Sequence, residues 1–160
     1  MLDLGDTSRG LRVLEEGLAA QTITRSALLR PYYFVLLAGA LLAVREFSRA
    51  QRALDDARAV AIATSQNAYA AEHARVQAEL LRVQGRGPEA ECFYVDAITA
   101  ARVQGALWLE LRAGRAFAEF LTADGRIDEA RRVLAEALAK VRKGQTTPDY
   151  VKAEALLATL

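Results

Sequence analysis

The chain has 160 residues and carries 21 basic and 20 acidic side chains, so its formal net charge is only +1. Nucleic-acid binding usually requires a concentrated basic excess, because phosphate neutralisation supplies most of the affinity. We therefore expect no nucleic-acid partner. The single cysteine, Cys92, excludes an internal disulfide and a cysteine-based zinc cluster. With 52% hydrophobic residues, a chain of this length can bury a core of its own.

No segment predicts membrane insertion or secretion. The longest apolar stretch, residues 31–44, is too short to span a bilayer and is flanked by Arg30 and Arg45. Residues 1–12 lack the apolar centre of a signal peptide. We expect a cytoplasmic protein without a membrane partner. A helical pattern begins almost at Met1, which predicts that the chain is a piece of a longer protein.

In chain order, helix-forming residues alternate with short turn sequences. Alanine, leucine, arginine and glutamate dominate, and all four favour helix. Breaks are predicted at Gly85-Arg86-Gly87, at Asp124-Gly125-Arg126 and in the loop 143–149. Pro31 lies either inside the second helix or at its first turn. The predicted helices span residues 7–21, 26–43, 48–65, 68–84, 88–104, 106–123, 127–142 and 149–160.

Small and large residues recur along these helices with a period of forty. One set of small residues is Gly10, Ala50, Ala90 and Ala130, followed four residues later by Leu14, Leu54, Tyr94 and Leu134, and three later again by Gly17, Ala57, Ala97 and Ala137. Upstream of these, the recurring residues are Ala38, Ala78 and Ala118, with Leu41, Leu81 and Leu121. Small residues in register permit close approach of helices, and their large neighbours fill the space between.

This spacing resembles the tetratricopeptide repeat, although the period is about six residues longer than the usual 34. We therefore predict an all-α fold, a tetratricopeptide-like right-handed solenoid of antiparallel helix pairs with about eight helices. Residues 1–160 would form a single helical-repeat domain, and the extra residues would lengthen the second helix of each pair. The expected parts are a half repeat (7–21), three repeats (26–65, 68–104 and 106–142) and a capping helix (149–160).

The second half of the chain resembles the C-terminal repeat region of large bacterial regulators. The matching residues are Ala78-Glu79-Leu80-Leu81, Glu89-Ala90-Glu91 with Phe93, Ala97-Ile98, Ala101-Arg102, Gly105-Ala106, Leu109-Glu110-Leu111-Arg112-Ala113, Gly125-Arg126, Glu129-Ala130-Arg131, Thr147-Pro148-Asp149 and Lys152-Ala153. Such regulators join a class III adenylate cyclase domain, or a winged-helix DNA-binding domain, to a central STAND-type ATPase. The resemblance implies a sensor or scaffold arm of such a protein, and no catalytic residue carries over.

The sequence predicts no catalytic, metal or cofactor site. Gly85-Arg86-Gly87 lacks the lysine of a phosphate-binding loop. His73 is the only histidine, so no second histidine could bind a metal ion with it. Cys92 is predicted to be a packed thiol rather than a nucleophile. We therefore expect that the chain is not an enzyme and needs no cofactor.

The remaining candidate is the concave groove of the repeats, which the first helix of each pair lines. The predicted groove residues are Tyr32, Val35, Gly39 and Leu42, then Glu72, Arg75, Glu79 and Arg82, then Arg112, Arg115, Glu119 and Thr122. Arginine suits carboxylates and phosphates, which favours recognition of a partner. Helical spacing equally favours internal pairs, namely Glu72 with Arg75, Glu79 with Arg82, and Arg115 with Glu119.

Two functional hypotheses follow from these patterns. The first is a protein-interaction scaffold of a bacterial signalling or transcriptional regulator, binding a peptide or a neighbouring domain of its own chain in the groove. The alternative is an intramolecular sensor arm that binds a small effector and regulates a cyclase or ATPase domain elsewhere in the chain. Self-association into a homodimer through exposed apolar repeat faces is a further possibility.

Overall fold

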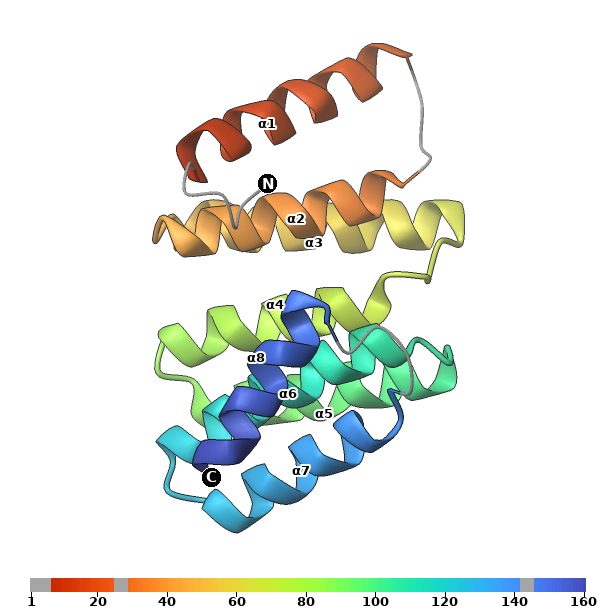
Figure 1. The fold of residues 1–160 in the computed structure, drawn as a ribbon. Helices are drawn as coiled ribbons and strands as arrows, with labels where there is room; N and C mark the ends of the chain where they lie inside the picture. The colour runs from red at the N-terminus through yellow and green to blue at the C-terminus, as the bar shows by residue number, and fades with distance from the viewer. Residues whose placement is uncertain (1–6, 25–28, 142–145) are drawn as a thin grey trace. The chain divides into compact units, whose positions relative to one another are not determined.

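The computed structural model describes residues 7–24, 29–141 and 146–160, and in these ranges all regular structure is helical (Figure 1). The helices are α1 (Thr7–Thr24), α2 (Arg30–Ala43), α3 (Phe47–Thr64), α4 (Ala70–Val83), α5 (Gly87–Val103), α6 (Leu107–Ala123), α7 (Ile127–Ala139) and α8 (Pro148–Thr159). This confirms the predicted all-α class and the eight predicted helices.

Most predicted helix ends lie within two residues of the observed ones. Helix α2 begins at Arg30, so Pro31 occupies its first turn, where the missing N–H of proline costs nothing. Residues 26–28 of the predicted second helix lie outside the described residues. Two predicted ends were wrong. Helix α1 continues to Thr24 instead of ending at 21, and α7 stops at Ala139 instead of continuing to 142. The chain leaves the helix there, and Val141 packs into the hydrophobic core.

The extra length of each repeat is not always in the second helix of the pair. Helix α3 has 18 residues against 14 in α2, and α5 has 17 against 14 in α4, as the sequence predicts. In the last pair the order is reversed, since α6 has 17 residues and α7 only 13. The prediction was therefore wrong for the third repeat.

Successive helices end in the same backbone turn every twenty residues. The residues with positive φ at these turns are Arg45, Ser65, Gly85, Gly105 and Gly125. After each, the next N–H bonds back to a carbonyl five residues earlier, as from Arg86 to Leu81 at 3.0 Å and from Arg126 to Leu121 at 2.9 Å. This left-handed cap satisfies carbonyls at the helix end. The sequence signals it with glycine in the second half of the chain only.

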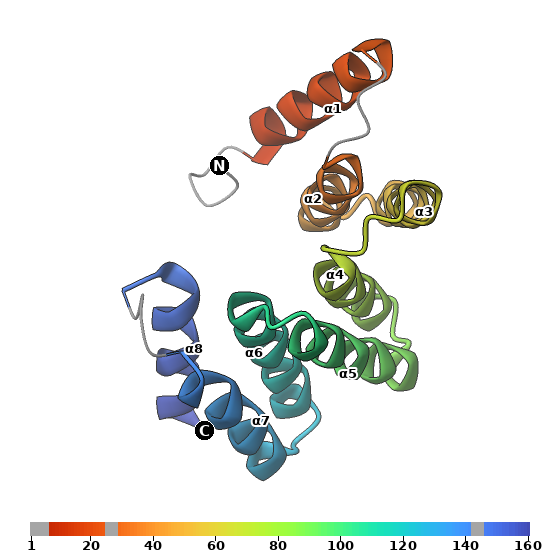
Figure 2. The same ribbon diagram turned by 90° about the vertical axis from the view of Figure 1, so that its right-hand side faces the viewer.

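The chain divides into two compact units, Met1–Tyr69 and Ala70–Leu160. In the first unit, α2 and α3 form an antiparallel pair. The side chains buried there include the predicted repeat residues Ala38, Leu41, Ala50, Leu54 and Ala57. Helix α1 packs against α2 (Figure 2), and the Glu15 carboxylate of α1 accepts a hydrogen bond from Arg49 of α3.

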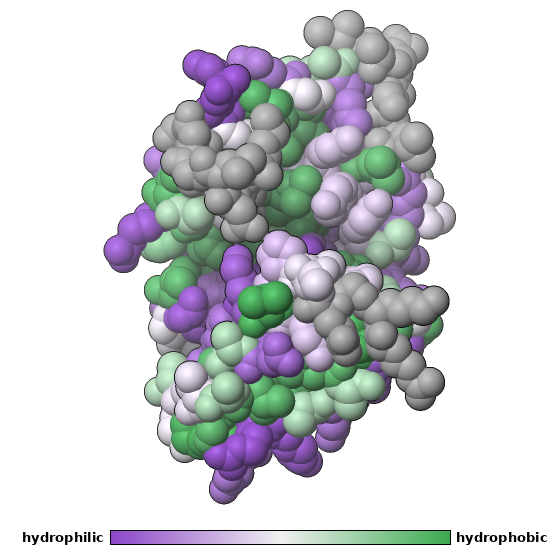
Figure 3. Space-filling model, in the orientation of Figure 1, coloured by the Kyte–Doolittle hydropathy of each residue, from purple (hydrophilic) through white to green (hydrophobic). Residues whose placement is uncertain are grey.

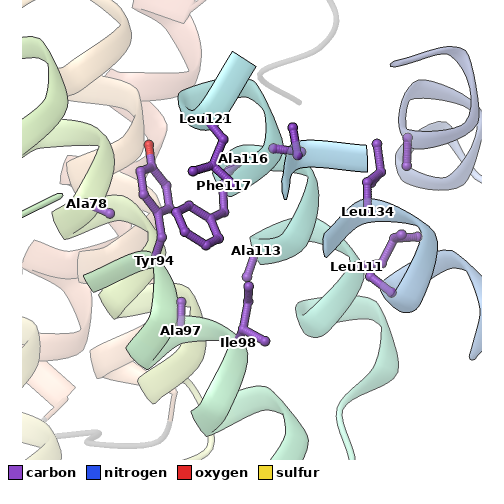
Figure 4. Close-up of a cluster of buried hydrophobic side chains, with 14 of the residues drawn as sticks. Ala78, Tyr94, Ala97, Ile98, Leu111, Ala113, Ala116, Phe117, Leu121 and Leu134 are labelled. Carbon is purple, nitrogen blue, oxygen red and sulfur yellow. The ribbon is translucent and has the colours of Figure 1, made fainter. Parts of the chain in front are cut away.

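In the second unit, α4 pairs with α5, α6 pairs with α7, and α8 packs against α6 and α7 (Figures 1 and 2). Tyr94 is completely buried, and its ring stacks on that of Phe117 with centroids 5.6 Å apart (Figure 4). Ala78 and Ala97 are 0% exposed in the same cluster. The small and large residues of the predicted repeat therefore form the core of this unit.

Helices α6 and α7 approach closely at Gly114. A Cβ atom placed on Gly114 would lie 3.1 Å from the Cβ of Ala137, nearer than ordinary packing allows. Gly114 lies four residues before Ala118 of the predicted repeat. Its lack of a side chain sets the distance between these two helices.

Candidate partner-binding face

Eight of the predicted groove residues lie in the second unit, four on α4 and four on α6. Residues three and four positions apart share one side of a helix, so Glu72, Arg75, Glu79 and Arg82 follow one side of α4. The same spacing aligns Arg112, Arg115 and Glu119 on α6. Helices α4 and α6 are in contact. The structure therefore brings these two predicted rows together.

Glu72 is the buried centre of this cluster, with only 5% of its surface exposed. Its carboxylate accepts hydrogen bonds from Arg75 Nη2 at 2.8 Å and Nε at 3.1 Å. Arg112 Nη1 on α6 lies 3.5 Å from the same carboxylate. Burial acts to raise the pKa of Glu72, but Arg75 and Arg112 outweigh it, so the pKa is lowered and the carboxylate is ionised.

Arg112 also joins α6 to α8. Its Nη2 and Nε atoms donate to the Asp149 carboxylate at 2.7 and 3.2 Å. One guanidinium thus bridges acidic groups from two helices, a geometry that suits the planar fork of arginine. None of the internal pairs predicted from helical spacing includes Arg112. Asp149 is 37 residues away in sequence, beyond the reach of any helical spacing rule.

The three internal pairs predicted from spacing are all present. Besides the Glu72–Arg75 pair, Arg82 donates to Glu79 at 2.9 and 3.0 Å, and Arg115 donates to Glu119. The Arg82 and Glu119 side chains are 46% and 47% exposed, so they form the open edges of the face. These pairs hold the arginine side chains in fixed positions before a partner binds, which lowers the entropy cost of binding.

An aromatic residue that the sequence analysis missed extends the α6 row. Trp108 lies one helical turn before Arg112 and is 37% exposed. Tryptophan and arginine are the side chains most enriched among residues that dominate binding energy. The spacing of four residues between Trp108 and Arg112 could have identified it. It was omitted because Arg112 is the first repeat position used to predict groove residues on α6.

The predicted groove residues of the first unit differ in exposure. Tyr32 stacks on Tyr69 with ring centroids 4.4 Å apart. Val35 is 2% exposed and offers a partner almost no surface. Glu72 in the second unit is equally inaccessible, and its role is to hold the neighbouring arginines. Val35 and Glu72 are therefore buried away from a partner, and the other predicted groove residues are partly or fully exposed.

A second buried carboxylate, Glu110, was also missed. It is 3% exposed and accepts hydrogen bonds from Arg102 Nε at 2.6 Å and from Lys140 Nζ at 2.5 Å. Burial opposes ionisation, yet these two cations lower the pKa of Glu110. The contacts tie the start of α6 to the ends of α5 and α7, so Glu110 stabilises the structure beneath the face.

The described residues contain no group of three or more His, Cys, Asp or Glu side chains that could hold a metal ion. Cys92 is exposed, so the prediction of a packed thiol was wrong. Within the described part of the chain, no helix is long and apolar enough to cross a bilayer. On the face shown in Figure 3, hydrophilic and hydrophobic side chains are interspersed.

Solved structures similar to this chain carry repeats of the predicted kind. The nearly identical TPR-like repeats of a kinesin light chain-type protein from Podosopora anserina align with a TM-score of 0.64 and 20% identity, over 97% of this chain and 77% of that one. A variant of the same protein aligns with a TM-score of 0.65 over the same shares. No family model and no curated protein sequence matches. The fold is therefore TPR-like.

Proposed function

We propose that this chain is a non-catalytic interaction module that binds a partner protein through the face formed by α4 and α6. The observation that carries the proposal is the α6 row, in which exposed Trp108 is followed by Arg112, Arg115 and Glu119 at helical spacing. A large aromatic surface beside ordered guanidinium groups is the combination that dominates many protein interfaces.

The arrangement of this face favours an acidic and partly apolar segment as the partner. An apolar side chain of the segment would pack on Trp108, and a carboxylate would approach Arg112 or Arg115. Arg112 is one-third exposed although Glu72 and Asp149 already bind it, so a third carboxylate would share its remaining N–H groups. Recognition of acidic segments by arginine clusters uses the same chemistry elsewhere.

Direct binding measurements on the folded chain test this proposal. The intact protein captures partners from its native cell extract, and each captured protein is then purified and titrated against the chain. We expect Trp108→Ala and Arg112→Gln each to weaken binding about tenfold or more, the loss typical of an interface hot spot. Circular dichroism confirms that both variants keep their helices.

Two variants away from the face serve as matched controls. Val103→Ala removes an exposed apolar side chain, and Arg131→Gln removes an exposed arginine on α7; both should leave the dissociation constant unchanged. If no captured protein binds the purified chain, or if the face variants bind as tightly as the controls, the proposed site is wrong.

We also propose that the module serves a cytoplasmic bacterial signalling or transcriptional regulator, as the resemblance of residues 78–160 implies. The partner would then be a domain that handles a nucleotide or DNA, in the same chain or in another. Identification of the captured protein by mass spectrometry tests this setting separately. A partner of an unrelated class would contradict the proposed regulatory role but not the proposed binding face.

A further inference from the structure

Each of the four arginines on the face formed by α4 and α6 already binds a carboxylate. Three of these pairs lie within one helix, namely Arg75 with Glu72, Arg82 with Glu79, and Arg115 with Glu119. The fourth arginine, Arg112, binds Asp149 of another helix, α8, as well as Glu72. The positive charges of the face are thus offset within the chain, so an incoming acidic segment meets resident carboxylates.

Asp149 occupies one edge of the Arg112 guanidinium. Its Oδ2 atom accepts hydrogen bonds from Nη2 at 2.7 Å and from Nε at 3.2 Å, while a Glu72 oxygen lies 3.5 Å from Nη1. A third carboxylate, as the proposed function requires, would bring three negative charges to one cation, and like charges at such distances oppose binding. The segment gains the full attraction of Arg112 only when one of the two resident carboxylates withdraws.

Of these two carboxylates, Asp149 is the one that can withdraw at small cost. Glu72 is 5% exposed and is also bound by Arg75 at 2.8 Å, and a buried carboxylate that loses a cation is strongly destabilised. The Asp149 side chain is 28% exposed, so water can replace Arg112 as its partner. Ion pairs that water can reach contribute little to stability for this reason.

The start of α8 also offers Asp149 an alternative interaction. Asp149 lies in the first turn of α8, and the N-cap residue Thr147 makes no side-chain hydrogen bond to the helix. The backbone N–H groups at a helix N-terminus attract negative charge. A carboxylate that leaves Arg112 therefore remains stabilised by its own helix. Because Ala153 of α8 is 0% exposed in the hydrophobic cluster, the helix can stay packed while the Asp149 side chain turns away.

We propose that Asp149 is an autoinhibitory carboxylate, which occupies Arg112 in the free chain and is displaced when an acidic segment binds. This inference rests on the proposed function, because it concerns the same face and describes how binding there is regulated. It predicts that the charge of Asp149 weakens the binding of acidic ligands. Removal of that charge should consequently strengthen binding.

A titration of the full chain with a synthetic peptide made only of leucine and glutamate tests this role. Trp108 is the only tryptophan and lies one helical turn from Arg112, so its fluorescence reports binding at the face. Asp149→Asn should bind the peptide about fivefold more tightly than the unchanged chain does. The matched control is Asp128→Asn, which removes an exposed carboxylate of α7 and changes the net charge equally. It should bind as the unchanged chain does.

A double-mutant cycle determines whether the gain depends on Arg112. In an Arg112→Gln background, Asp149→Asn should give no gain, because the cation that Asp149 occupies is absent. A gain that persists in this background overturns the proposal. So does an Asp149→Asn protein that binds as the unchanged chain does or more weakly, since Asp149 would then position Arg112 for the partner. That result leaves the proposed face intact. If circular dichroism shows folded proteins but neither the unchanged chain nor Asp149→Asn binds the peptide, the face for an acidic partner is itself wrong, and the role of Asp149 is overturned with it.

Discussion

Among single residues, Glu72 has a large expected effect on stability. Its carboxylate is 5% exposed and bound to Arg75 and Arg112. Breaking a buried pair by neutralising one partner typically costs about 3 kcal/mol, so Glu72→Gln should lower the free energy of unfolding by about that amount at pH 7. Denaturant unfolding monitored by circular dichroism measures this change.

The same substitution has a predictable pH dependence. The pKa of Glu72 is lowered in the folded state, so its stabilisation is present above the unfolded value of about 4.3 and is lost as pH falls through the folded pKa. The difference between the unchanged chain and Glu72→Gln should therefore shrink in acid. Glu89→Gln, which breaks the exposed pair with Arg86, should change stability only slightly at either pH. A difference that stays constant from pH 7 to about pH 3 would contradict the assigned role.

Among structural elements, the helix caps share one left-handed position, but only some of them have glycine there. Arg45 has φ of 63°, in the left-handed region that glycine occupies at 85, 105 and 125. A side chain there costs about 1–2 kcal/mol, partly offset because glycine loses more entropy on folding. Arg45→Gly should therefore stabilise the chain by about 0.5–1 kcal/mol, measured as a shift of the denaturant midpoint.

Arg52→Gly is the matched control for this cap, because it removes the same exposed charge from the interior of α3. Glycine inside a helix destabilises it by about 0.5–1 kcal/mol. The two substitutions should consequently shift stability in opposite directions. If both destabilise the chain, the left-handed cap at Arg45 carries no strain and the argument from backbone conformation is wrong.

At the scale of the whole chain, the sequence predicted the features that local periodicity determines, which are the buried residues and the ion pairs within one helix. The forty-residue pattern placed Ala78, Tyr94 and Ala97 in the core, and all three are fully buried. Helical spacing likewise predicted the pairs within α4 and α6. Contacts between distant segments were missed, as with Asp149 on Arg112, because they depend on how α8 packs.

The same limit explains the remaining errors. The stop of α7 at Ala139 follows from the packing of Val141 into the core, which no turn signal announces. Trp108 was overlooked because its importance comes from exposure beside Arg112, and exposure follows only from the packed structure. Periodicity therefore supplies the elements and their buried sides, while the binding face requires the tertiary arrangement.

Residues 70–160 should fold without the rest of the chain. The main hydrophobic cluster lies wholly within this segment and runs from Ala74 to Ala153, and the segment is one of the two compact units. Tyr94 is enclosed by α4 and α6 side chains from the same segment, including Ala78 and Phe117. In a repeat protein each repeat depends mainly on its neighbours, so this fragment retains the contacts that its core needs. Thermal unfolding followed by circular dichroism should show one cooperative transition.

A fragment of residues 88–160 lacks α4 and exposes Tyr94, so it should unfold without a sharp transition. An unfolded 70–160 fragment would show that the cluster depends on the first sixty-nine residues, and equal cooperativity in both fragments would show that α4 adds little to the core.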